Sequence, residues 1–93
     1  MALPHRRQQL AKFIPFHDFT PASFAAEVSK YLTEDEALKR WDILNITYGR
    51  RYPSARELRA IELALGGSLP INVVLEESML RDYDGDLRLE CES

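Results

Sequence analysis

Apolar residues recur along most of this 93-residue chain at intervals of three and four, which is the spacing of helices that bury one face. The pattern predicts an all-α fold of about five helices. The expected ranges are residues 4–16, 20–32, 33–48, 54–65 and 68–80. Pro15 limits the first helix, and Thr20 followed by Pro21 is a strong start signal for the second.

The third predicted helix has two interpretations, which the sequence leaves open. Thr33 and Glu36 form a capping box, and a helix that starts there can run unbroken through Ile43 to Tyr48. Alternatively, an additional turn is inserted before Ile43, and the segment contains two helices.

A glycine stop and a basic turn separate this segment from the fourth predicted helix. Gly49 suits the positive φ at which many helices end, and Pro53 prevents simple continuation. Ser54 and Glu57 then form a second capping box, and Gly66 provides the next stop. The sequence therefore predicts a helix, a tight turn and a helix around the centre of the chain.

The C-terminal end has two alternative interpretations. The predicted closing helix turns four apolar residues inward, namely Ile71, Val74, Leu75 and Met79. Beyond a turn signal at Asp84 and Gly85, apolar and polar residues alternate with strand period. The segment is either a strand or hairpin through which the protein dimerises, or a frayed acidic tail. We therefore divide the chain into a domain over residues 1–80 and a tail or dimerisation strand over residues 81–93.

Length and composition predict one small cytoplasmic domain. A hydrophobic fraction of 45% is ordinary for a folded chain. No apolar run approaches the roughly 18 residues that a membrane span needs, and the first residues lack the apolar segment of a signal peptide. The single cysteine, Cys91, cannot form an internal disulfide. We expect no membrane association.

Charge is distributed unevenly along the chain, whose net charge is −3. Residues 38–60 contain six basic and two acidic residues, a net charge of +4, whereas residues 61–93 contain two basic and eight acidic residues, a net charge of −6. A local positive patch is what docking on phosphate requires, whatever the total charge. The alternative is that these charges lie by chance on solvated faces.

Residues 41–69 resemble a known family in an ordered set of features: two isoleucines, a glycine stop, a basic turn, a cap and a second glycine stop. The matching residues are Ile43, Ile46, Gly49, Arg50, Arg51, Pro53, Ser54, Leu58, Ile61, Ala64, Leu65, Gly66, Ser68 and Leu69. This run, about a third of the chain, is similar to the second half of a Cro/C1-type helix-turn-helix domain. The resemblance implies a lambda-repressor-like fold that binds double-stranded DNA. The chain departs from the family in the extra residues before Ile43 and in the lack of a glycine turn there.

The resemblance also implies which residues contact DNA. Counted back from Gly49, the base-reading positions fall at Arg40, Trp41 and Asn45. Arginine suits guanine and asparagine suits adenine, whereas Trp41 equally fits a place in the core, which we slightly favour. The residues expected to bind phosphate are Lys39, Tyr48, Arg50, Arg51 and Arg56, of which the Arg50–Arg51 pair is the strongest candidate. For Arg56, a solvated surface position is an equal alternative.

Catalytic, metal and cofactor sites are not expected. His5 and His17 are far apart in unlike contexts, and no His, Cys or carboxylate cluster has metal-ligand spacing. Cys91 lies among glutamates, which disfavour its thiolate. No glycine-rich phosphate loop is present.

The function expected is that of a sequence-specific transcriptional regulator, a repressor of plasmid, phage or toxin–antitoxin type that reads the major groove as a homodimer. The alternative is a protein-binding module, an antitoxin or inhibitor, whose acidic C-terminal region masks a basic partner. The acidic residues concerned are Glu76, Glu77, Asp82, Asp84 and Asp86. The two functions are distinguished by whether Arg40, Asn45, Arg50 and Arg51 share one exposed face.

Overall fold

The computed structural model describes residues 3–67 and 69–80, and in these residues all of the regular structure is helical. The helices are α1 (Leu10–Phe16), α2 (Pro21–Ser29), α3 (Arg40–Thr47), α4 (Ala55–Ala64) and α5 (Ile71–Val74), with the 3₁₀ turns η1 (Glu34–Glu36) and η2 (Glu77–Met79). The prediction of an all-α fold with about five helices is confirmed. The predicted C-terminal strand or hairpin, together with residues 81–93, lies outside the described residues.

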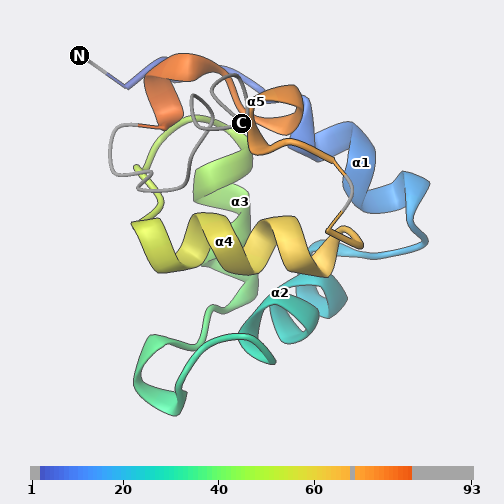
Figure 1. Ribbon diagram of the computed structural model, residues 1–93. Coiled ribbons are helices and arrows are strands. Elements are labelled where there is room, and N and C mark those ends of the chain that lie inside the picture. The colour runs from blue at the N-terminus through green and yellow to red at the C-terminus, as the bar shows by residue number, and fades with distance from the viewer. Residues whose placement is uncertain (1–2, 68, 81–93) are drawn as a thin grey trace, which may run out of the picture.

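Helix α2 packs against both α3 and α4, and the three enclose most of the core. In Figure 1, α4 crosses in front of α3, α2 lies below them, and α1 and α5 cover the upper side. The fully buried side chains that join these helices include Phe24, Val28, Ile43, Ile46, Leu58 and Ile61. None of the helices in the described part of the chain is both long and apolar enough to cross a membrane.

Two of the predicted helix starts have the expected caps. The Thr20 hydroxyl accepts a hydrogen bond from the Ser23 amide at 3.1 Å, where α2 begins. At α4, the Ser54 hydroxyl accepts from the Glu57 amide at 3.2 Å, while the Glu57 carboxylate accepts from the Ser54 amide at 2.9 Å. These caps involve residues three apart, which is why local sequence was sufficient to predict them.

The first helix is shorter than predicted, because it begins at Leu10 rather than near residue 4. The preceding segment bonds instead to the end of α3. The His5 amide donates to the Gly49 carbonyl at 3.0 Å, and the Gln8 amide donates to the Thr47 carbonyl at 2.7 Å. These partners satisfy backbone groups that a longer helix would have paired internally.

The same N-terminal segment is also bonded to Glu76, which lies between α5 and η2. Arg6 donates two hydrogen bonds to the Glu76 carboxylate, at 2.7 and 2.8 Å. The buried Gln8 accepts from the Glu76 amide at 2.9 Å and donates to its carboxylate at 3.0 Å. The N-terminal segment is therefore held between the end of α3 and the start of η2.

This contact predicts a loss of stability in acid. The paired guanidinium of Arg6, with further hydrogen bonds from Gln8 and Ser78, lowers the pKa of Glu76 from 4.5 to about 2. The pKa of Glu76 is lower in the folded protein than in the unfolded chain. The ionised Glu76 carboxylate therefore stabilises the fold fully above pH 4.5, and this stabilisation is lost as the pH falls toward 2. We expect denaturant unfolding to show a shallower decline over this range for Glu76→Gln than for the wild type. Equal declines would contradict a role for this carboxylate.

The third predicted helix is in fact two elements, so the unbroken interpretation is wrong. Thr33 caps only the short turn η1, and the backbone is extended at Ala37 and Lys39 before α3 begins. Leu38 between them is buried, and its amide donates to the Ser29 hydroxyl at 2.9 Å. A bond from α2 thus stabilises the break, and nothing in the local sequence indicates it.

The predicted closing helix is also divided. Helix α5 ends at Val74, Leu75 is extended, and η2 follows. The Glu76 amide donates to Gln8, which removes it from any continuing helix. The apolar pattern was nevertheless informative, because all four predicted inward residues are buried.

Candidate nucleic-acid interface

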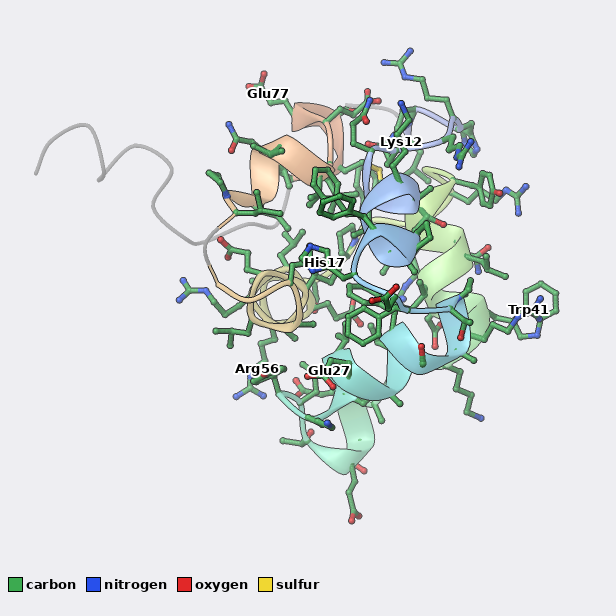
Figure 2. The ribbon with its side chains drawn as sticks, turned by 90° about the vertical axis from the view of Figure 1, so that its right-hand side faces the viewer. Lys12, His17, Glu27, Trp41, Arg56 and Glu77 are labelled. Carbon is green, nitrogen blue, oxygen red and sulfur yellow. The ribbon has the colours of Figure 1, made fainter. Side chains whose placement is uncertain are left out.

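Helix α3 presents a row of residues to solvent at helical spacing, which we call the α3 row: Trp41, Leu44, Asn45 and Tyr48. Trp41 is 67% exposed and Tyr48 is 39% exposed, while Leu44 and Asn45 are half-buried. In Figure 2, Trp41 points away from the body of the protein. The prediction that slightly favoured Trp41 as a core residue is wrong, because the buried face of α3 is supplied by Ile43 and Ile46.

Two arginines flank this row, each over an aromatic ring. The Arg40 guanidinium carbon lies 5.4 Å from the centroid of the Trp41 ring, and that of Arg50 lies 5.3 Å from the centroid of the Tyr48 ring. Cation–π contacts orient a guanidinium without neutralising its charge. Both arginines therefore remain available to an anion.

Lys39 adds a third cation at the start of α3. Its amide donates to the Asp42 carboxylate at 2.8 Å, which caps the helix, and its side chain is exposed. Six of the eight predicted site residues thus lie on α3 or immediately beside its ends: Lys39, Arg40, Trp41, Asn45, Tyr48 and Arg50.

Arg51 has a different environment from Arg50. Its guanidinium donates to Glu57 at 2.7 Å and lies 3.6 Å from a carboxylate oxygen of Asp42. Its side chain is 35% exposed, and that of Glu57 is only 9% exposed. Arg51 therefore ties the start of α3 to the start of α4. The choice between DNA binding and protein binding was to depend on whether four residues share one exposed face. Arg40, Asn45 and Arg50 lie on or beside the α3 row. Arg51 does not, because it is held between α3 and α4.

Arg56 lies on the other side of the protein from Trp41, as Figure 2 shows. Its guanidinium donates to the Glu36 carboxylate at 2.8 Å in an exposed ion pair, which raises the pKa of Arg56 and lowers that of Glu36. Arg59, from the same helix, is 3.6 Å from Glu62. The geometry does not bring Arg56 together with the α3 row.

The cations of the described residues fall into two groups. Those with an acidic partner are Arg6, Lys30, Arg51, Arg56 and Arg59. Those for which the described residues provide no acidic partner within 4.0 Å are Arg7, Lys12, Lys39, Arg40 and Arg50. Three of the second group adjoin α3, so uncompensated positive charge is concentrated there.

Arg7 is a further candidate site residue, which the sequence pattern did not indicate. It lines a pocket of about 300 Å³ beside the α3 row, together with Leu44 and Tyr48. The remaining lining residues are Ala11, Ile14, Pro15, Phe19, Thr20, Pro21 and Thr47. The basic pair Arg6–Arg7 was visible in the sequence, but the bonds that carry Arg7 to the end of α3 join residues about 40 positions apart.

The link between α2 and α3 limits how an anion approaches. It contains η1, in which Glu34 and Asp35 are exposed. These carboxylates repel phosphate near the start of α3, whereas Arg7 and Arg50 attract it near the end. An anionic partner is therefore favoured along the row toward Tyr48.

Comparison of the chain with models of protein families, with curated proteins and with solved structures finds no match.

Proposed function

We propose that this protein is a DNA-binding transcriptional regulator of helix-turn-helix type that places the α3 row in the major groove. The observation that carries the proposal is the concentration of uncompensated cations around α3. An α-helix fits that groove, and phosphates are the partners that such cations favour.

Within this proposal the residues have distinct roles. Arg40 and Asn45 read bases, since their side chains match the acceptor and donor patterns of guanine and adenine. Arg7, Lys39 and Arg50 contact phosphates on either side of the groove. The exposed ring of Trp41 supplies an apolar contact, for which the methyl group of thymine is the natural partner. A homodimeric cytoplasmic repressor of plasmid, phage or toxin–antitoxin type is the class that we favour.

The test is a titration of the full chain with DNA chosen by selection from random sequences, at 50 and 200 mM salt. If the three phosphate-binding cations (Arg7, Lys39 and Arg50) each neutralise one phosphate, the logarithm of the affinity falls with the logarithm of the salt concentration with a slope of about −2.7 per domain. If the selection enriches no DNA sequence, or if the affinity does not depend on the salt concentration, the proposal is ruled out.

A protein partner at the same face is the second candidate. Tryptophan, tyrosine and arginine are the residue types that dominate protein-binding hot spots, and all three are exposed here. The acidic-region alternative has weaker support, because Glu76 is already bonded to Arg6, Gln8 and Ser78. Glu77 is exposed, and Asp82, Asp84 and Asp86 lie outside the described residues.

A further inference from the structure

Helix α1 ends in an unusually exposed aromatic side chain. Phe16 is 78% exposed, and its ring meets that of Phe13 edge to face at a centroid distance of 6.5 Å. Beside it lies a pocket of about 220 Å³ lined by Gln9, Lys12, Phe13 and Phe16. A projecting ring and a hollow are thus formed by one short helix.

Two opposite charges lie on either side of Phe16 along the chain. Lys12 precedes Phe16 by one helical turn, and Asp18 follows the end of the helix. Both are exposed, and neither lies within 4.0 Å of an opposite charge among the described residues. Along α1 and the residues that follow it, the chain therefore exposes a cation, an aromatic ring and an anion in that order.

We propose that α1 is the surface through which two copies of this chain form a symmetric dimer. When two α1 helices lie antiparallel about a two-fold axis near Pro15, Lys12 of each copy meets Asp18 of the other. The same operation places each Phe16 ring beside the pocket of its partner. An isologous interface requires this self-complementarity of one patch.

The position of α1 relative to α3 suits a dimer that binds DNA. This part of the inference rests on the proposed function. In Figure 2, α1 faces the viewer while Trp41 of α3 points to the right. A two-fold axis parallel to that direction, with α1 at the interface, leaves both α3 rows pointing the same way. The domain measures 36 × 28 × 26 Å, so two copies side by side separate equivalent points by a distance comparable with the roughly 34 Å of one DNA turn.

The test is sedimentation equilibrium of the full chain over a range of concentrations. Phe16→Ala is expected to weaken the dimer at least tenfold, by analogy with other central aromatic contacts. The matched control is Tyr31→Ala, which truncates an exposed aromatic ring beyond α2 and should change the dimer constant less than twofold. Phe16 is exposed, so its truncation leaves the folded core intact.

The charge pairing is tested by a double-mutant cycle. Lys12→Gln and Asp18→Asn should each weaken the dimer by about threefold, and the double variant should weaken it no further, because each single change breaks the same pairs. Asparagine is chosen because residue 18 has a φ of 63°, which it tolerates.

The outcomes separate this inference from the proposed function. A wild-type monomer at all concentrations, a Phe16→Ala dimer of unchanged affinity, or fully additive charge effects would overturn it, even if DNA still binds. A dimer with the expected Phe16 dependence that binds no DNA would support the α1 interface and count against the proposed function.

Discussion

Replacement of Gly49 by alanine is expected to lower the free energy of unfolding by about 3 kcal/mol. Gly49 has a φ of 68°, which an alanine adopts only with strain. An added Cβ would also lie 2.9 Å from the Arg6 carbonyl oxygen and from the Pro4 ring. The His5 amide holds this segment against the Gly49 carbonyl, so the backbone cannot simply move away.

Gly67→Ala is the matched control for this change. Gly67 has a similar φ of 77°, but a Cβ there would meet nothing within 4 Å. The Gly67→Ala variant should lose only the free energy that a positive φ costs an alanine, about 1 kcal/mol. Urea denaturation followed by circular dichroism measures both variants. Equal losses would show that the N-terminal segment does not press against the end of α3 as the structure indicates.

Features of the fold that depend on neighbouring residues were predictable from sequence. The caps at Thr20 and Ser54 link residues three apart, and the stop at Gly49 needs only a residue that tolerates positive φ. The apolar periodicity also predicted the inward residues of the last segment, although not its division into α5 and η2.

Features that depend on distant hydrogen bonds were not predictable. The late start of α1 reflects the bond from Gln8 to Thr47, and the interruption before α3 reflects the bond from Leu38 to Ser29. The division after α5 reflects the bond from Glu76 to Gln8. In each case a polar group is satisfied by a partner that helical spacing does not indicate.

The candidate site likewise combines features that the sequence predicts with features that only tertiary packing determines. Helical spacing places Trp41, Asn45 and Tyr48 in one row, but it does not reveal which face of α3 is buried. The contrast between Arg50 and Arg51 depends on Glu57, whose carboxylate is brought to Arg51 by the packing of α4. Whether a cation is free or paired is a tertiary property, and it decides which residues the site contains.

Removal of Arg40 and Arg50 together is expected to weaken DNA binding by about a hundredfold or more. The estimate combines the loss of one base contact and one phosphate contact, of which base contacts alone contribute about 1–3 kcal/mol. The salt slope should become shallower by about 0.9, because one fewer phosphate is neutralised. Both side chains are exposed and neither is in an ion pair within the described residues, so stability should change little.

The most direct test compares Arg40→Ala/Arg50→Ala with Arg56→Ala/Arg59→Ala in the same DNA titration. The two variants lose the same net charge, but Arg56 lies opposite Trp41 in Figure 2, and Arg59 lines the same pocket as Arg56. We predict that the first variant loses binding and that the second stays within about threefold of the wild type, since surface ion pairs contribute little. Equal losses in both would contradict binding at the α3 row and would indicate only a general attraction of positive charge to DNA.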